Sequence, residues 1–297
     1  MPYTKFQCPD GIEVGIDECL MGCRLAGITK PDGELWCPGG RCLSKQVLRA
    51  VADQRLWKGK PSTTQLLNGT RENYLRIVND YSINPRNSMF MLHGTRVHNN
   101  LEQYTEGDEL AEIRLEDDYS TGAFDYYDPE NGGTLYDSKT YGSFKVAHVL
   151  GLKEVQIPTG EFYKNGNPKV KKKYIPGGCH HRLDLAVQLN DYRMKIEKKL
   201  HLPVKHMLCQ VIVRDGNTFI ASSRGVTEPS YLVPINRISD KWVERFMCAK
   251  SEALINAIES GICPPPCNAR ERWNGRKCQN YCDVNKFCDY YNKELKR

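Results

Sequence analysis

Residues 121–140 read as two short strands joined by a tight turn, and this hairpin constrains the fold more than any other segment. The Asn-Gly-Gly run at 131–133 accepts the positive φ angles that a hairpin turn requires. Antiparallel pairing would bring Asp125 on the first strand close to Asp137 and Lys139 on the second. Because side chains alternate along a strand, Asp137 and Lys139 share a face. The sequence therefore predicts two carboxylates and an ammonium at one end of a sheet.

Two converging carboxylates indicate a site for a hard divalent cation. Asp125 and Asp137 supply the oxygen ligands that Mg²⁺ or Mn²⁺ prefers, and His98, on a predicted helix over residues 88–105, can add an imidazole. Such a cation neutralises charge on a phosphate and makes bound water more acidic. Lys139 would then hold the attacking water beside the metal. Taken alone, the same residues also describe an ordinary surface hairpin with two acids and a lysine.

Hydrophobic periodicity predicts further elements around this hairpin. A helix over residues 180–200 places Gln188 and Tyr192 one turn apart on a single face. A lysine-rich polar insertion at 160–178 is either a solvated loop or an electrostatic track for a phosphate backbone. The other predicted elements are a strand at 109–115, a strand-turn-strand unit at 206–225, and helices at 43–57, 61–81 and 242–260.

Four short motifs occur in a fixed order along the chain: G-T-R-V-H at 94–98, G-A-F-D at 122–125, D-S-K at 137–139 and Q-L-N-D-Y at 188–192. This series resembles the RecB-like branch of the PD-(D/E)XK nucleases, which includes the CRISPR-adaptation nuclease and the nuclease domain of AddB. The resemblance covers roughly residues 62–225. It implies a mixed α/β fold with a restriction-endonuclease-like core, in which helices flank a central mixed sheet.

The resemblance also implies roles for individual residues. His98, Asp125 and Asp137 would bind the metal together with a backbone carbonyl next to Asp137. Lys139 would be catalytic, and Gln188 and Tyr192 would orient the lysine and contact DNA. The chain departs from the commoner pattern at one point, because Asp137 stands where most relatives have Glu.

The cysteines indicate a second kind of site. Thirteen are present, ten of them in the two terminal segments, and thiols in a reducing compartment more readily bind metal than form disulfides. In several relatives a [4Fe-4S] cluster is held by one upstream cysteine and a C-x2-C-x5-C group, and the tail here has a C-x3-C-x5-C group. Either one such staple or two separate sites, with an iron-sulfur cluster or Zn²⁺, fits the pattern. The candidate ligands are Cys8, Cys19, Cys23 and Cys42 at one end and Cys267, Cys278, Cys282 and Cys288 at the other.

The three remaining cysteines, Cys179, Cys209 and Cys248, are expected to be core residues, with Cys179-His180-His181 a weaker candidate for an extra site. Three segments are expected: a cysteine-rich segment and helix at 1–60, the nuclease core at 61–235, and a C-terminal helix and cluster tail at 236–297. The sequence contains no signal-peptide pattern and no membrane-spanning run, so a cytoplasmic protein that does not bind membranes is expected.

The expected function is that of a Mg²⁺- or Mn²⁺-dependent exonuclease that hydrolyses DNA in repair, recombination or phage replication. The net charge of +6 permits DNA, as ends or single strands, to be the partner. No Walker-type phosphate loop is present, so unwinding would require a separate helicase or recombination protein. The alternative is a DNA-binding or partner-docking iron-sulfur or zinc protein with a vestigial nuclease site.

Overall fold

The computed structural model describes residues 3–178 and 182–296, and the chain divides into two compact units. One unit comprises Met1–Thr95 together with Met247–Arg297, and the other comprises Arg96–Phe246. The candidate group Cys179-His180-His181 lies outside the described residues. Among the helices of the described chain, none combines the length and the apolar character that a membrane span requires.

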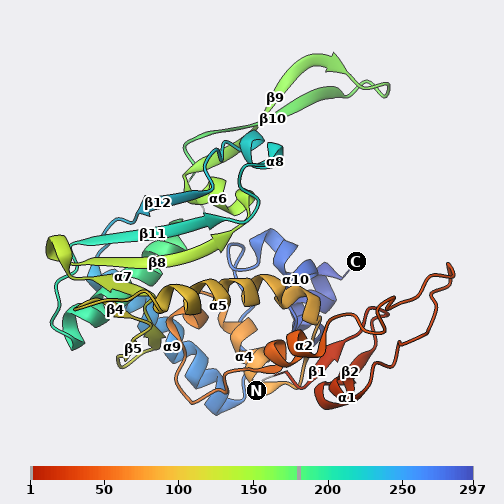
Figure 1. Cartoon of the computed structure of the whole chain (residues 1–297), viewed down its shortest axis with the longest axis horizontal. Helices are drawn as coiled ribbons and strands as arrows, with labels where there is room; N and C mark the ends of the chain where they lie inside the picture. Colours follow the sequence, from red (N-terminus) through yellow and green to blue (C-terminus); the bar gives the residue numbers. More distant parts are fainter. Residues whose placement is uncertain (1–2, 179–181, 297) are drawn as a thin grey trace. The chain divides into compact units, whose positions relative to one another are not determined.

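The second unit is built on a five-stranded mixed sheet with strand order β12-β11-β8-β7-β4 (Figure 1). The central strand β8 pairs in parallel with β11 and antiparallel with β7. The predicted mixed α/β architecture is therefore confirmed. The five strands are β4 (Leu110–Ala111), β7 (Tyr126–Asp128), β8 (Thr134–Tyr141), β11 (His206–Val213) and β12 (Ser230–Pro234).

Two helices, α6 (Ser143–Val149) and α7 (Arg182–Lys199), pack on this sheet and share a core with it. Leu135 of β8, Leu189 of α7 and Val211 of β11 are fully buried there. Burying a side chain of this size stabilises a fold by about 1.5–3 kcal/mol. The apolar contacts hold α7 against β8, so polar side chains on the same face of α7 are brought to the strand that carries the candidate site.

The turn between β7 and β8 forms as the sequence predicts. Asn131, Gly132 and Gly133 have φ angles of 54°, 87° and 86°, and residues Glu130–Gly132 form the short 3₁₀ turn η2. A Cβ added to Gly133 would lie 1.9 Å from the carbonyl oxygen of Pro203. Only glycine therefore fits at that position.

The two strands predicted at 109–115 and 122–127 are each interrupted. The first breaks at Glu112, whose φ is 51°, into β4 and β5 (Arg114–Glu116). The second breaks before Asp125 into β6 (Thr121–Ala123) and β7, and β6 pairs with β5 in a small separate sheet. The breaks adjoin each other, because Glu112 N donates to Asp125 O at 3.2 Å. Glu112 and Asp125 therefore lie between strands and do not follow the regular alternation of a strand.

The lysine-rich insertion forms a β-ribbon and is not a polar loop. Strands β9 (Leu152–Phe162) and β10 (Pro168–Pro176) pair antiparallel in a two-stranded ribbon that extends beyond the main sheet (Figure 1). Leu152 and Tyr174 pack at its base against the core of this unit. Phe162 and Tyr163, at its far end, are exposed.

The prediction of a strand at the end of residues 206–225 is wrong, because residues Phe219–Ser223 form helix α8. Thr218 caps this helix by accepting a hydrogen bond from Ala221 N at 3.2 Å. A Thr at the N-cap satisfies a free N–H group of the first turn and favours a helix there. The antiparallel partner of β11 is instead β12.

The first unit contains a three-stranded sheet, β2-β1-β3, and a core that includes Phe6, Leu48 and Leu254. Its helix predicted over 61–81 is two helices, because Gly69 is the N-cap that starts the second. The elements are β1 (Lys5–Gln7), β2 (Glu13–Gly15), α1 (Ile16–Met21), α2 (Lys45–Ala52), α3 (Thr63–Leu66), α4 (Thr70–Val78), β3 (Ser82–Ile83), η1 (Pro85–Ser88), η3 (Trp273–Gly275), α10 (Arg276–Asn280), η4 (Asn285–Phe287) and η5 (Tyr291–Leu295), while α5 (Met89–Glu102) and α9 (Asp240–Ser260) run through the unit boundaries.

The division into units differs from the expected segments 1–60, 61–235 and 236–297. Residues 61–95 belong with the two chain ends, because helix α4 lies against the C-terminal tail. Arg71 Nε donates to Pro264 O at 2.6 Å, and Lys277 Nζ donates to Glu72 Oε2 at 2.6 Å. The tail is thus part of the same compact unit as the segment before α5.

Candidate active site and cysteine centres

The candidate active site is arranged around strand β8. Asp137 and Lys139 lie two residues apart on one face, and Lys139 Nζ donates to Asp137 Oδ1 at 2.6 Å. From helix α7, Gln188 Nε2 donates to the same carboxylate oxygen at 3.1 Å. Gln188 also contacts the hydroxyl of Tyr192 at 3.5 Å. The four residues predicted from separate motifs are therefore brought together as one buried polar chain.

Asp125 completes the carboxylate pair from the neighbouring strand. Tyr126 pairs with Tyr136, so Asp125, one residue before β7 begins, lies opposite Asp137. Its Oδ2 accepts a hydrogen bond from Ser138 N at 2.7 Å. The predicted approach of Asp125 and Asp137 across the hairpin follows directly from this register.

His98 reaches the same place from helix α5. Its Nε2 lies 2.9 Å from Ser138 O, and its Nδ1 lies 3.5 Å from Asp125 Oδ2. The carbonyl of Ser138 is the backbone group next to Asp137 that the sequence resemblance implied. Glu102, one turn further along α5, is exposed and remains outside the site.

Sequence reasoning missed Glu112 as a candidate ligand. Its Oε1 lies 3.3 Å from His98 Nδ1, and one ligand atom each from His98, Glu112 and Asp125 lie within 4.8 Å of one another. In the described part of the chain no other three His, Cys, Asp or Glu side chains are that compact. The positive φ of Glu112 turns it out of the strand, and such strained backbone often marks functional sites. A strand pattern in the sequence gives no signal for it.

The electrostatics are those of charges confined in a buried site. Burial and the neighbouring Asp137 raise the pKa of Asp125 to about 7. Burial would lower the pKa of Lys139, but the carboxylates of Asp137 and Asp125 outweigh it and hold that pKa above its usual value. The hydrogen bond with Glu112 raises the pKa of His98. The carboxylates of Asp137 and Asp125 thus favour the charged form of Lys139, while burial and Asp137 disfavour the charged form of Asp125.

A second lysine near the site also escaped prediction. Burial, followed by repulsion from Lys139, lowers the pKa of Lys145 on α6 to about 8. Its Nζ lies 3.9 Å from the ring centroid of Tyr141, a cation–π contact. In the sequence, Lys145 looks like an ordinary residue on the polar face of a short helix.

These residues fit a divalent cation. Asp137 is fully buried, and its Oδ2 has no hydrogen-bond partner in the described structure, although buried carboxylate oxygens are normally satisfied. The His98 imidazole and the carboxylates of Glu112 and Asp125 form the compact donor set, with the Ser138 carbonyl 2.9 Å from His98 Nε2, whereas Asp137 lies outside this group. Such a set suits Mg²⁺ or Mn²⁺.

Known proteins offer little guidance here. No family model matches the chain, and no curated protein matches it. A solved structure described as "Crystal structure of SSO0001" aligns with 82% of this chain and 93% of its own, at 13% sequence identity and a TM-score of 0.41. At that identity and score the likeness carries no argument about function.

The predicted tail cysteines meet in one cavity of about 30 Å³ in the first unit. Backbone N–H groups bond to two of the sulfurs, that of Glu72 to Cys267 and that of Val284 to Cys282. Burial raises the pKa of the Cys282 thiol to about 12. All four predicted ligands line the cavity, together with Arg71 and Lys277: Cys267, Cys278, Cys282 and Cys288.

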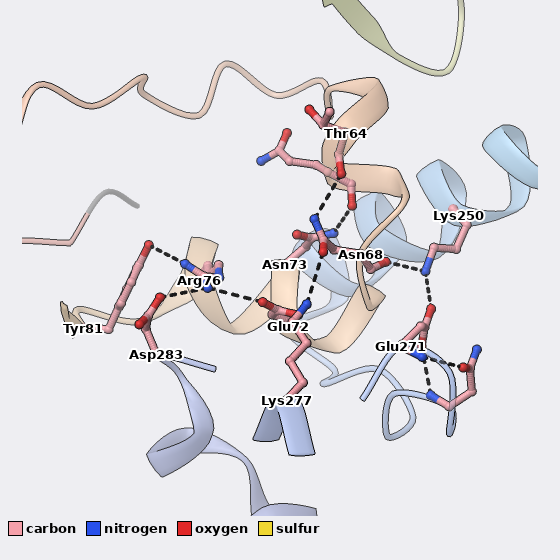
Figure 2. Close-up of polar contacts among 12 residues, drawn as sticks. Thr64, Asn68, Glu72, Asn73, Arg76, Tyr81, Lys250, Glu271, Lys277 and Asp283 are labelled. Atoms are coloured by element: carbon pink, nitrogen blue, oxygen red, sulfur yellow. Dashed lines mark hydrogen bonds and ion pairs between the residues drawn. The ribbon is translucent and has the colours of Figure 1, made fainter. Parts of the chain in front are cut away.

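Ion pairs along helix α4 hold this tail in place, as Figure 2 shows. Glu72 accepts a hydrogen bond from Lys277, and Arg76 Nη2 lies 2.9 Å from Asp283 Oδ2. A further ion pair joins the tail to helix α9, where Lys250 Nζ lies 2.6 Å from Glu271 Oε1. Helix α4 thus forms the wall of the cavity that faces the tail. Among the described residues, the cysteines that line the cavity all come from the tail, and none comes from the N-terminal segment.

Zinc–sulfur bonds of about 2.3 Å in a tetrahedron place sulfurs roughly 3.8 Å apart. In the described chain, no three cysteine sulfurs lie within 4.8 Å of one another. Neither the tail sulfurs nor the N-terminal sulfurs therefore have the arrangement of a closed zinc site in this structure.

The N-terminal cysteines also gather, but with a different membership from the predicted set. Cys8, Cys19, Cys23 and Cys42 lie close enough to influence one another's ionisation, and Cys37, which was left out of the predicted ligands, joins them. Of the cysteines expected in cores, Cys209 is fully buried. The expectation is wrong for Cys248, which is partly exposed on α9 and donates to Glu252 at 3.2 Å.

Proposed function

We propose that this chain is a metal-dependent deoxyribonuclease with a PD-(D/E)XK-type core. One observation carries the proposal: the compact group of His98, Glu112 and Asp125 lies across the β7–β8 hairpin from Asp137, whose carboxylate accepts a hydrogen bond from the ammonium of Lys139. A structural salt bridge alone has no need of the unpaired buried oxygen of Asp137. Mixed-sheet topology with the site on the central strand supports the same assignment.

The chemistry divides among the residues of the site. A divalent cation bound there would neutralise charge on a phosphate and make a water molecule more acidic. Lys139, held by Asp137, would orient the attacking water or contact a phosphate oxygen, since its ammonium stays charged. Gln188 is a positioning residue, because it donates to Asp137. Tyr192 is buried in the core and supports Gln188, so it is poorly placed to contact DNA as the resemblance implied.

The cysteine cavity and the lysine-rich ribbon extend this proposal. The tail cavity would hold a [4Fe-4S] cluster that fastens the tail to helix α4, with thiolates as ligands. The ribbon would contact the DNA backbone through Lys171 and Lys173, to which no ion-pair partner is assigned in the described structure. Lys169 and Lys172 differ, since they pair with Glu161 and Glu154 at 2.9 and 2.8 Å.

A cleavage assay tests the proposed function. The purified protein should degrade labelled linear DNA with Mg²⁺ or Mn²⁺ and be inhibited by EDTA. Asp125→Asn and Lys139→Ala should each reduce the rate by at least about 100-fold, because each removes charge stabilisation or positioning made in the transition state. Glu102→Gln, on the same helix as His98 but exposed, is the matched control and should cleave normally.

The outcomes separate the candidate functions. Cleavage of linear but not circular single strands indicates an exonuclease, whereas cleavage of both indicates an endonuclease. Tight DNA binding with no metal-stimulated hydrolysis by the wild-type protein would support the alternative of a vestigial site. Wild-type cleavage by Asp125→Asn would show that the catalytic centre lies elsewhere.

A further inference from the structure

The N-terminal segment contains few apolar residues that could hold it in one conformation. Between residues 20 and 42, only Leu25 and Cys37 are buried. Ordering a chain of this length costs conformational entropy at every residue, and two buried side chains cannot offset that cost. A folded segment of this kind needs another source of stabilisation, as small metal-binding modules do.

Two cysteines of this segment begin the same tight turn. Cys8-Pro9-Asp10-Gly11 and Cys37-Pro38-Gly39-Gly40 share the pattern C-P-x-G, and each closes with a hydrogen bond from the glycine N–H to the cysteine carbonyl, at 2.9 and 2.8 Å. The glycines have φ angles of 85° and 75°. Each of these two cysteines therefore begins a tight turn that a backbone hydrogen bond closes.

Cys23 begins a closed turn of a different sequence. Ala26 N donates to Cys23 O at 3.1 Å, and Gly27, which follows, has a φ of 73°. Three separate stretches of chain thus present a cysteine at the start of a closed turn, and two of them share the C-P-x-G pattern.

The surrounding contacts bring these turns together. Cys23 and Cys42 both lie close enough to Cys37 to raise the pKa of its thiol, and Cys42, Cys8 and Cys23 do the same for Cys19. Arg41 Nη1 donates to Cys19 O at 2.7 Å and so ties the helix α1 to the residue before Cys42. Cys37 is the most buried member, with 2% of its surface exposed.

We propose that this cluster binds a thiolate-ligated metal centre, of zinc or iron-sulfur type, that is separate from the tail cavity, and that Cys37 is one of its ligands. The cluster consists of Cys8, Cys19, Cys23, Cys37 and Cys42. Each thiol that binds releases its proton to solvent. The proposal is independent of the nuclease assignment, because it concerns only the folding and metal content of the N-terminal segment.

Separation of the two centres follows from their neighbours. The cysteines that influence Cys19 and Cys37 all belong to the N-terminal cluster. Those that influence Cys278 and Cys282 belong to the tail. A single staple that uses one N-terminal cysteine and three tail cysteines would mix the two sets.

Metal analysis of the full-length protein tests this inference. After anaerobic purification, iron, zinc and acid-labile sulfide are measured per chain in the wild type, Cys37→Ser, Cys23→Ser/Cys42→Ser and Cys278→Ser/Cys282→Ser. Cys248→Ser is the control for loss of a thiol outside both centres. The N-terminal variants should lose a fixed equivalent of metal that the tail variant retains, and the tail variant should lose a different equivalent. Sulfide lost with the metal identifies a cluster, and zinc lost without sulfide identifies a single ion.

Wild-type metal content in both Cys37→Ser and the Cys23→Ser/Cys42→Ser variant would overturn the proposal. If these variants do not fold, alkylation of the native wild-type protein gives the answer. The N-terminal thiols should resist iodoacetamide until the metal is removed by a chelator or acid and then react. Equal alkylation of these thiols before and after metal removal would also overturn the proposal.

Discussion

The backbone N–H of Ser138 donates to the carboxylate of Asp125 at 2.7 Å, while the carbonyl of the same residue lies 2.9 Å from His98 Nε2. Ser138 thus joins the strand that carries Asp137 to the two other candidate ligands. The relationship explains why a short hairpin and a distant helix form one site, because both bind the backbone of a single residue of β8. It also makes the geometry sensitive to the register of that strand.

Glu112→Gln should weaken Mn²⁺ binding by about 10- to 100-fold, whether Glu112 binds the ion or only orients His98. The change removes a charge 3.3 Å from His98 Nδ1 but keeps the shape of the side chain. Titration calorimetry of Mn²⁺ against wild type, Glu112→Gln and Glu102→Gln measures the effect. Equal affinity in all three proteins would remove Glu112 from the site.

Gly69→Ala should reduce the metal affinity of the tail cavity by about tenfold. A Cβ at this position would lie 2.3 Å from Cys267 Sγ, so the sulfur must rotate away from the other thiols. Gly142→Ala is a matched control, because Gly142 is also the N-cap of a helix. A Cβ added to Gly142 would lie 3.6 Å from its nearest neighbour, Arg214 Nη2, which is an ordinary van der Waals distance. Metal content and absorbance near 400 nm report the result. Loss of metal in both variants would point to a general effect of the cap.

Removing both unpaired lysines of the ribbon should weaken DNA binding and lower its salt dependence. Lys171 and Lys173 lie opposite Ile157 and Val155 on one face. The logarithm of the DNA-binding constant falls linearly with the logarithm of the salt concentration. If each lysine contacts a phosphate, Lys171→Ala/Lys173→Ala should reduce the magnitude of this slope by about 2. Fluorescence anisotropy between low and high salt measures this slope. An unchanged slope would show that the ribbon is not a DNA-binding surface.

The paired lysines of the ribbon supply the control for that experiment. In the Lys169→Ala/Lys172→Ala variant, the lysines removed are already neutralised by Glu161 and Glu154, so the slope should change less. A larger change in the control than in the test pair would indicate that Lys169 and Lys172, and not Lys171 and Lys173, contact DNA.

Asp215→Asn should destabilise the second unit by about 1–2 kcal/mol at pH 7. Asp215 accepts hydrogen bonds from Ser143 N and Ser143 Oγ, each at 2.6 Å, and so caps helix α6. Partial burial would raise the pKa of Asp215, but the bonds from Ser143 outweigh it and hold that pKa below its usual value. The ionised Asp215 carboxylate therefore adds to the free energy of unfolding at pH values above its unfolded-state pKa. This stabilisation is lost as the pH falls through the folded-state pKa.

Urea unfolding at pH 7 and near pH 3 checks this dependence. The difference in unfolding free energy between wild type and Asp215→Asn should shrink at the lower pH, because the wild-type carboxyl is then protonated. Ser143→Ala removes the hydroxyl's bonds to Asp215 and Arg224 but keeps the bond from Ser143 N to the Asp215 carboxylate, so its effect should depend less on pH. A difference that is independent of pH would mean that the charge of Asp215 does not contribute.

Features that depend on neighbouring residues could be predicted, whereas features that depend on distant contacts could not. The turn at 131–133 and the shared face of Asp137 and Lys139 were predictable, because they depend on φ preferences and on the two-residue period of a strand. The breaks at Glu112 and Asp125 were not, since each is stabilised by the other from a distant part of the chain. The ribbon was missed because its alternation is masked by lysines on both faces.

The sequence by itself determined the residue types of the site and their local faces: an acid and a lysine two apart on β8, and a Gln and a Tyr one turn apart on α7. Only the tertiary structure decided which of these groups share a site. It added Glu112 to the acids and Cys37 to the N-terminal thiols, and it placed the tail cysteines against α4. Local geometry depends on neighbours along the chain, whereas the membership of a site depends on packing between distant segments, which no short pattern encodes.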